Sequence, residues 1–253
     1  SLQGNTISGN QTQLQLRGAL ISGQYIEQIQ AELVGKLNDG QLQVTVQDAD
    51  FSVSSVGRLY WTDLKQVYNA QSFQIQANDF GTWQLQEPMQ VQLTNDSYRF
   101  SSFCLASRKH SGRVCAEDTG SSIAIAGSDF PLLLLEPWLN NAGKEFTYTG
   151  LASLKGELPK DFSLAGSGYV DLQVPSLKIG VKPNTDNEIG RIDNLNMQAK
   201  WLGNRLSGKI SASLRQNGFI EGEINTGIAS NAELSGKLKV QIYNLEWLEL
   251  FSL

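Results

Sequence analysis

Polar and apolar residues alternate along most of this chain with a period of two. Gln41–Gln47 alternates without a fault. The other clearly alternating runs are 73–77, 83–86, 90–94, 170–174 and 237–242. Because successive side chains of a strand point to opposite faces, each run predicts a strand with one apolar face and one solvated face. This pattern is typical of an antiparallel sheet, because parallel strands are usually buried on both faces.

Turn residues separate the alternating runs. Asn38-Asp39-Gly40, Gly203-Asn204 and Gln216-Asn217-Gly218 are examples, and such clusters predict tight connections. A weak repeat of the form apolar, any residue, Gly, charged, apolar occurs at 33–37, 154–158, 206–210 and 234–238. A glycine at a fixed place in a strand indicates a bend, a bulge or a closely packed neighbour. The irregular spacing of the copies favours a stack of similar hairpins over a strict solenoid.

One segment, 129–139, does not alternate and contains four consecutive leucines at 132–135. It predicts one short helical or irregular apolar insert in an otherwise all-β chain. Ser128 or Asp129 is the expected helix cap, with Pro131 in the first turn. Two roles stay open for this insert, either filling a core between stretches of sheet or plugging an apolar groove.

The composition changes modestly along the chain. Glutamine is concentrated in the first 92 residues, and lysine becomes commoner after residue 144. We therefore expect a soft boundary within one continuous architecture. Residues 1–145 form the first part, which includes the cysteines and the insert, and residues 146–253 continue the sheet.

The net charge and the hydropathy of the chain limit the kinds of molecule that it is expected to bind. The 253-residue chain carries a formal net charge of -5, so no basic field favours nucleic acid. No apolar run reaches the roughly 18 residues of a membrane span, and the first residues lack the pattern of a signal peptide. Both ends fall within strand-like text, which leads us to expect a segment of a longer protein.

Residues that carry catalytic or metal chemistry are few and scattered. His110 is the sole histidine, which excludes a multi-histidine metal site and disfavours a Ser-His-acid triad. The acidic pairs Asp48/Asp50 and Glu221/Glu223 each share one strand face, as paired carboxylates or calcium ligands would. Solvated strand faces explain these pairs equally well. We expect no enzymatic activity and no cofactor.

The only two cysteines, Cys104 and Cys115, flank a short hairpin tip. If Arg108–Ser111 is a four-residue loop, the two cysteines face each other across the hairpin. Directly opposed residues lie within disulfide range, so we predict a disulfide and an oxidising compartment such as a bacterial periplasm. The alternative is a pair of reduced, buried cysteines in a cytosolic sheet.

The cysteine hairpin belongs to an ordered series of motifs. The series comprises 103–105, 113–117, 122–126, 130–139 and 146–158. Over residues 98–160 this series resembles the TamB family, the inner-membrane-anchored subunit of the translocation and assembly module of diderm bacteria. Elsewhere the resemblance is one of general texture, with short amphipathic strands, glycine turns and few charges.

The resemblance implies a fold, a location and partners. Its fold is a long, mostly antiparallel sheet of short amphipathic strands folded into an open trough, the β-taco. The implied location is the periplasm, in a full-length protein anchored in the inner membrane and extending towards the outer membrane. The implied partners are phospholipid acyl chains in the trough and an outer-membrane barrel of the TamA type. The barrel would be contacted through parts of the protein outside this sequence, and no nucleic acid is implied.

If such a trough exists, the apolar positions of the alternating runs should line it and contact lipid. These positions are Leu42, Val44, Val46, Phe73, Ile75, Leu85, Val91, Leu93, Ile123, Ile125, Leu172, Val174, Leu238, Val240 and Ile242. The resulting hypothesis is an envelope segment that holds or conducts phospholipid, supports outer-membrane protein assembly, or both. The alternative is a structural or adhesive secreted β protein with a closed core and a binding patch on its polar face.

Overall fold

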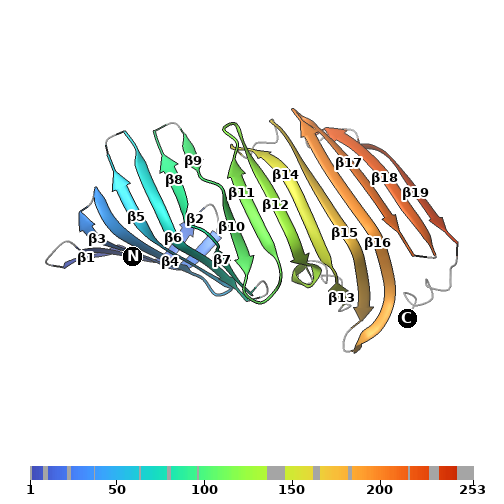
Figure 1. Ribbon diagram of the computed structural model, residues 1–253, viewed down its shortest axis with the longest axis horizontal. Helices are drawn as coiled ribbons and strands as arrows, with labels where there is room; N and C mark the ends of the chain where they lie inside the picture. The colour runs from blue at the N-terminus through green and yellow to red at the C-terminus, as the bar shows by residue number, and fades with distance from the viewer. Residues whose placement is uncertain are drawn as a thin grey trace. The chain divides into compact units, whose positions relative to one another are not determined.

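A computed structural model describes the chain over twelve stretches. These are residues 2–7, 11–21, 24–36, 38–62, 64–78, 81–95, 97–135, 146–161, 166–181, 184–215, 217–227 and 234–243. In this part of the chain 19 strands and one 3-10 helix are present, and every strand pairing given for it is antiparallel (Figure 1). The expected fold class, all-β and antiparallel with one short helical insert, is confirmed.

The chain divides into two compact units, which are described separately. Unit 1 comprises Ser1–Lys109 with Cys115–Asp118, and unit 2 comprises His110–Val114 with Thr119–Leu253. The soft boundary expected near residue 145 stays a prediction.

Unit 1 is a ladder of hairpins with short turns. Its strands are β1 (Leu2–Ile7), β2 (Gln11–Ile21), β3 (Gln24–Lys36), β4 (Asp39–Gln47), β5 (Phe51–Trp61), β6 (Gln66–Ala77), β7 (Gly81–Leu85), β8 (Met89–Leu93), β9 (Tyr98–Phe100) and β10 (Phe103–Ser107). From β1 to β6 each strand pairs with the next along the chain. The long strand β6 then pairs with both β7 and β8, β10 pairs with β7, and β9 pairs with β8.

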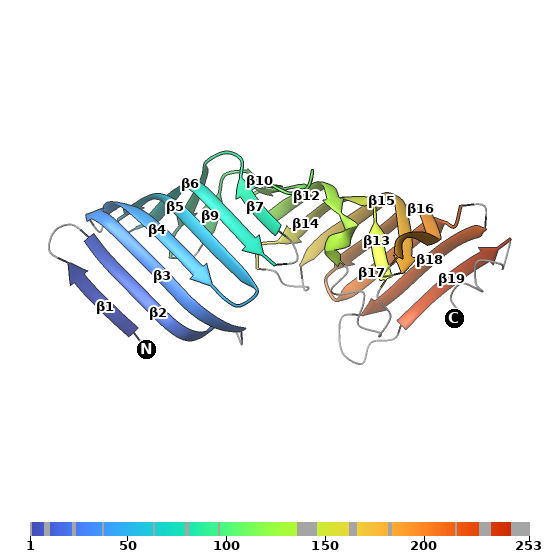
Figure 2. The same cartoon turned by 90° about the horizontal axis from the view of Figure 1, so that it is seen from below.

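Unit 2 is a second ladder with longer strands. Its strands are β12 (Ser122–Pro131), β13 (Phe146–Thr149), β14 (Leu151–Pro159), β15 (Ser167–Val181), β16 (Asn184–Leu202), β17 (Arg205–Ser213), β18 (Gly218–Gly227) and β19 (Leu234–Ile242). β12 pairs with β14, and from β14 to β19 the strands pair in chain order, as the yellow-to-red arrows of Figure 2 show. β13 adds a short pairing with β15. The strand β11 (Arg113–Asp118) contributes residues to both units.

The apolar insert begins later than the sequence predicts. β12 continues to Pro131, which pairs with Leu151, and the 3-10 helix η1 spans Leu132–Leu135 next to β13 (Figure 1). The expected cap at Ser128 or Asp129 is therefore wrong. The reason is a bulge: the register with β14 shifts between Gly127 and Phe130, and Asp129 takes a positive φ of 51°. The bulge absorbs the irregular residues without ending the strand. Residues 136–139 of the expected insert lie outside the described residues.

Candidate functional site

The eight groove-lining residues predicted in unit 1 all lie on one face of its sheet. Directly paired residues of antiparallel strands point to the same side. One row of partners runs from Val46 through Val53 and Ile75 to Trp83, and a second pairs Tyr68 with Val91 and Val91 with Phe100. The eight residues are Leu42, Val44, Val46, Phe73, Ile75, Leu85, Val91 and Leu93. We call this side the apolar face of unit 1.

The seven residues predicted in unit 2 likewise share one face. A row of direct partners runs across six strands from Leu154 through Leu172, Met197, Ile210 and Gly222 to Leu238. The seven predicted residues are Ile123, Ile125, Leu172, Val174, Leu238, Val240 and Ile242. We call this side the apolar face of unit 2. The register thus brings the predicted residues together within each unit.

On the apolar face of unit 2, side chains of neighbouring strands fill the space beside the glycines. Gly208 pairs with Ile224, and a Cβ placed on Gly208 would come within 2.9 Å of the Ile224 Cγ1 atom. Gly222 similarly lies against Ile210 and Leu238. Glycine and branched residues alternate across these strands, so each branched side chain occupies the space that a glycine leaves. The packed neighbour is therefore the correct one of the three explanations for the glycine repeat in this region.

Coverage of the apolar faces is uneven. Leu132 of η1 packs on Ala152 and Val174, and Val174 is only 1% exposed. Far from η1 along the ladder, Leu238 is 70% exposed, and in unit 1 Leu93 is 45% exposed. Ile123 is buried, Val240 is exposed, and the other predicted residues are half-buried. Among the side chains that the structure describes, Val174 is the one large residue that is fully buried.

Polar groups interrupt the apolar faces at two places. In unit 1 the hydroxyl oxygens of Tyr68 and Ser55 lie 2.8 Å apart in a hydrogen bond, and burial raises the pKa of the Tyr68 phenol. In unit 2 Asp193 pairs with Ser176 across the strands, and its carboxylate accepts a 2.9 Å hydrogen bond from the Arg191 Nε group. That bond holds the pKa of Asp193 below its ordinary value.

The polar face of unit 1 is built mainly from amides and hydroxyls. One row of direct partners runs across six strands through Gln15, Gln30, Thr45, Ser54, Gln74 and Gln84. Amides of neighbouring strands bond to each other, with Gln84 donating to Gln74 at 2.5 Å and Gln90 donating to Asn69 at 2.8 Å. An exception is the exposed Arg58–Asp39 ion pair at 2.8 Å, whose hydrogen bond lowers the pKa of Asp39.

The polar face of unit 2 carries alternating charges instead. The corresponding row runs through Lys155, Asp171, Gln198, Lys209, Glu223 and Lys237. Lys209 and Glu223 form an exposed ion pair at 3.1 Å. Opposite charges that face each other across strands stabilise a sheet modestly, so this face needs no covering layer.

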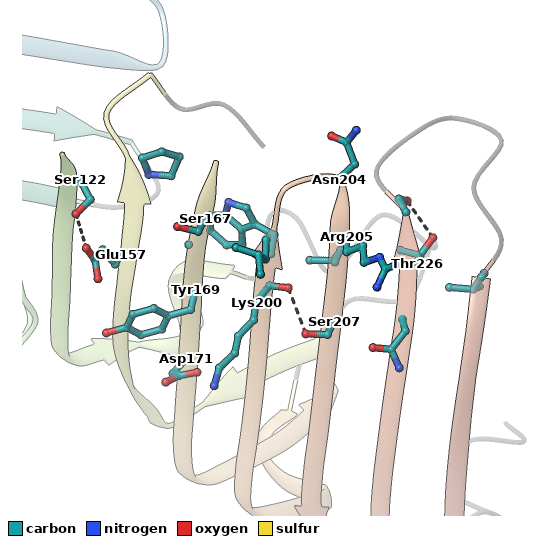
Figure 3. A pocket seen from close by; sticks show the side chains of 18 of the residues that line it. Ser122, Glu157, Ser167, Tyr169, Asp171, Lys200, Asn204, Arg205, Ser207 and Thr226 are labelled. Atoms are coloured by element: carbon teal, nitrogen blue, oxygen red, sulfur yellow. Dashed lines mark hydrogen bonds between the residues drawn. The ribbon is translucent and has the colours of Figure 1, made fainter. Parts of the chain in front are cut away.

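A hollow of about 1590 Å³ lies at the ends of the strands of unit 2, where side chains of both faces meet (Figure 3). Glu157, Tyr169, Lys200 and Ser207 line it from the polar face, and Trp201 lines it from the apolar face. A second hollow of about 510 Å³ lies on the same polar side, and Asp171 lines both. None of the predicted groove residues lines the larger hollow, and only Leu172 lines the smaller.

Sequence reasoning missed the larger hollow. Its residues come from seven strands and two connecting turns, so they are adjacent only after the register is set. The available signal was weak: Lys200 and Trp201 lie just before the end of one alternating strand, and Arg205 begins the next strand after a Gly-Asn turn. Such a strand end is where polar and apolar faces meet.

The two cysteines are joined by a disulfide between β10 and β11, with an S–S distance of 2.13 Å and Cα atoms 4.0 Å apart. Cys104 precedes the bends at 108–111 and Cys115 follows them, as the proposed hairpin requires. The bond closes a short loop of the chain, and such a loop restricts the unfolded chain.

Metal-binding clusters and membrane-spanning helices are both absent from the described residues. No group of three or more histidine, cysteine, aspartate or glutamate side chains there is placed to hold a metal ion. Across the same stretches no helix is both long and apolar enough to cross a membrane.

Comparison with known proteins gives one match that covers nearly the whole chain. The family model described as TamB, N-terminal domain, matches residues 1–252. No curated protein and no solved structure matches the chain.

Proposed function

This chain belongs to the TamB family, and from that premise we propose that its apolar faces hold or conduct phospholipid acyl chains. The protein would act in the periplasm, within a longer molecule that is anchored in the inner membrane and extends towards the outer membrane. Assembly of outer-membrane proteins with a TamA-type barrel would use parts of the protein outside this sequence. No catalytic group is needed for this role, because an apolar wall transfers acyl chains without changing a covalent bond.

The observation that carries the proposal is a sheet face that is apolar and largely uncovered. An apolar face is ordinarily buried against a second layer. Among the residues that the structure describes in unit 2, Leu132 of η1 covers the region around Val174, whereas Leu238 and Val240 are exposed. Exposed contiguous apolar surface marks a binding region for protein, membrane or ligand. Acyl chains fit this surface because the rows of unit 2 from Leu154 to Leu238 and from Gly156 to Gly236 carry only apolar residues and glycine.

A closed adhesive module would have a different core. Two packed sheets bury the large residues of both inner faces, and a closed core typically contains many fully buried side chains. In the described part of this chain only Val174 meets that description among the large residues. Leu42, Val44 and Val46 are half-buried, as the side chains of an accessible apolar wall are.

The location within the periplasm rests on two independent supports. One is family membership. The other is the Cys104–Cys115 disulfide, because stable disulfides accumulate in oxidising compartments. Mass determination of the protein from the periplasmic fraction, with and without reductant before alkylation, tests whether the bond forms there.

The direct test compares charge placed on the apolar and polar faces. Leu93→Arg and Leu238→Arg each put a guanidinium on exposed apolar positions of unit 1 and unit 2. Gln90→Arg and Gln241→Arg are the controls, because each places the same group on the same strand but on the polar face. Native mass spectrometry followed by lipid extraction measures the bound phospholipid in each variant.

We expect the two leucine variants to lose co-purifying lipid while circular dichroism shows an unchanged fold. The two glutamine variants should keep lipid at the wild-type level, because charge on the polar face stays in water. Equal lipid content in all four variants, or a wild-type protein without lipid, would contradict the proposal. The second result would direct attention to a protein or glycan partner of the polar face.

A further inference from the structure

The larger hollow of unit 2 contains charged groups that the proposed acyl-chain path does not use. Lys200 lies in the last three residues of β16, and Arg205 begins β17 on the other side of a tight turn (Figure 3). In the described part of the chain neither side chain forms a hydrogen bond or an ion pair. Lys200 pairs with Ser207, so Arg205 is its diagonal neighbour. In Figure 3 the Lys200 side chain extends towards Asp171 and that of Arg205 towards Thr226. Diagonal neighbours lie roughly 7–8 Å apart, so a change of rotamer in these two exposed side chains would bring both to one anion.

A carboxylate without a partner lies on the opposite side of Lys200. Asp171 is two residues from Tyr169, the direct partner of Lys200. The Asp171 Oδ1 atom is buried and, among the described residues, accepts no hydrogen bond and forms no ion pair with Lys155, its partner on β14. A buried carboxylate oxygen without a donor is costly. The site therefore offers two cations for an anion and, next to them, one acceptor for a cation.

The hollow also connects the polar face to the apolar face. Trp201 is 9% exposed, packs over Gly168, and lines the hollow from the apolar side. Its buried indole Nε1 group has no hydrogen-bond acceptor in the stretches that the structure describes. Leu206 and Leu234 line the hollow from the same apolar side. A buried indole N–H usually finds a partner, so this rim presents one unused donor next to apolar surface.

We propose that this rim binds a zwitterionic phosphate ester that carries a primary ammonium, as the headgroup of an aminophospholipid does. The phosphate binds to Lys200 and Arg205, because a guanidinium and an ammonium form strong charge-assisted bonds to phosphate oxygens. The ammonium donates to Asp171, and the Trp201 N–H donates to an ester oxygen at the apolar edge. This inference rests on the proposed lipid function for the source of the headgroup, whereas the charge recognition is independent of it.

Three probes test separately whether the headgroup charges are recognised and whether a lipid carries them. They are dihexanoyl phosphatidylethanolamine, dihexanoyl phosphatidylglycerol, which lacks the ammonium, and soluble phosphoethanolamine. Calorimetric titration of each into the whole chain measures affinity. We expect the ethanolamine lipid to bind most tightly. Asp171→Asn should abolish the preference for it over the glycerol lipid. The double variant Lys200→Gln/Arg205→Gln should weaken the binding of both lipids by about tenfold or more, since the loss of a single charge-assisted bond accounts for about tenfold.

The matched control is Lys36→Gln/Lys65→Gln, which removes the same charge from exposed positions of unit 1 and should leave all affinities unchanged. Wild-type affinities in both hollow variants would overturn the headgroup site. Phosphoethanolamine that binds as tightly as the lipid would overturn the lipid as its source. Leu238→Arg distinguishes the two proposals: it should lose lipid yet still bind phosphoethanolamine, so the apolar path and the headgroup site can fail separately.

Discussion

The two units share one rule for their apolar faces and follow different rules for their polar faces. In both, the register places the apolar positions of every alternating strand on a single side. The other side of unit 1 is a hydrogen-bonded amide surface, as in the Gln84–Gln74 bond, whereas unit 2 uses charges, as in Lys209–Glu223. The shift from glutamine to lysine along the chain therefore reflects a change in the polar face, from amides in unit 1 to charged side chains in unit 2. The constant face is the one that the proposed function uses.

The units also differ in how the apolar face is covered. In unit 2 Leu132 seals a small region in which Val174 is 1% exposed. In unit 1 the described apolar face has no helical cover, and Val44 is half-buried. The same residue type at equivalent positions of an alternating strand thus occupies a sealed core in one unit and an accessible wall in the other.

The largest expected effect comes from a charge placed in the sealed region. Val174→Asp buries a carboxylate without a partner and should lower the free energy of unfolding by about 4 kcal/mol or more. Val44→Asp puts the same group on the accessible wall, where water reaches it, and should cost about 1–2 kcal/mol. Hydrogen exchange of the whole chain measures both, with peptides from β15 reporting on the first variant and peptides from β4 on the second.

Equal loss of protection in the two variants would show that the apolar face of unit 1 is as sealed as the Val174 region. The distinction between core and wall would then fail, and with it the main support for a lipid path over unit 1. Val240→Asp provides an internal control, because this exposed position lies in unit 2 yet should behave like Val44.

A loss of stability of intermediate size is expected when a glycine that packs under an aromatic ring is replaced, and both units contain such a glycine. Gly57 and Gly168 each lie under an aromatic ring of a neighbouring strand. A Cβ on Gly57 would come within 2.8 Å of the Tyr68 ring and 2.3 Å of a backbone oxygen, and one on Gly168 within 2.3 Å of the Trp201 ring. Gly57→Ala and Gly168→Ala should therefore each cost about 1–3 kcal/mol, as overpacking does. Chemical denaturation of the whole chain measures the loss.

Gly127→Ala is the matched control for these two variants. A Cβ there would meet its nearest neighbour, the Leu154 Cβ, at an ordinary 3.4 Å, and alanine reduces the entropy of the unfolded chain. Its stability should equal or slightly exceed that of the wild type. If Gly168→Ala matched it, the ring of Trp201 would move freely, and the fixed N–H invoked in the headgroup site would lose its basis.

Much of the fold follows from local pattern, because period two both defines a strand and assigns its faces. The run 41–47 predicts β4, found at Asp39–Gln47, and the same alternation correctly groups its apolar residues with those of β6 and β8. The repeat glycines could be located, and their packing role was one of the stated possibilities.

The coverage of the apolar faces and the larger hollow of unit 2 could not be predicted from local pattern. Val174 and Val240 have similar sequence surroundings, but only Val174 lies near η1, and their exposure differs accordingly. The hollow joins Glu157, Lys200 and Asn225, whose proximity depends on the register of every strand between them. The helix cap was misplaced because the positive φ of Asp129 favours a bulge over a helix start.

The smallest expected effect concerns two carboxylates that are held by arginines, Asp39 in unit 1 and Asp193 in unit 2. Both have a pKa below the ordinary 3.8, chiefly because of hydrogen bonds from Arg58 and Arg191. A lowered folded-state pKa stabilises the fold above pH 3.8, and this contribution is lost as the pH falls through the folded-state value. Arg58→Gln and Arg191→Gln should each lower the melting temperature slightly at pH 7 and not at about pH 2, where the carboxylates are protonated.

The two units should differ in how salt changes the effect of these arginine substitutions on the melting temperature. The Arg58–Asp39 side chains are 54% and 42% exposed, and those of Arg191–Asp193 are 32% and 24% exposed. Salt screens exposed pairs more strongly than partly buried ones. Raising the ionic strength should therefore abolish the effect of Arg58→Gln before that of Arg191→Gln in thermal melts of the whole chain. The reverse order would mean that the Arg191–Asp193 pair on the apolar face of unit 2 is more open to solvent than the Arg58–Asp39 pair on the polar face of unit 1.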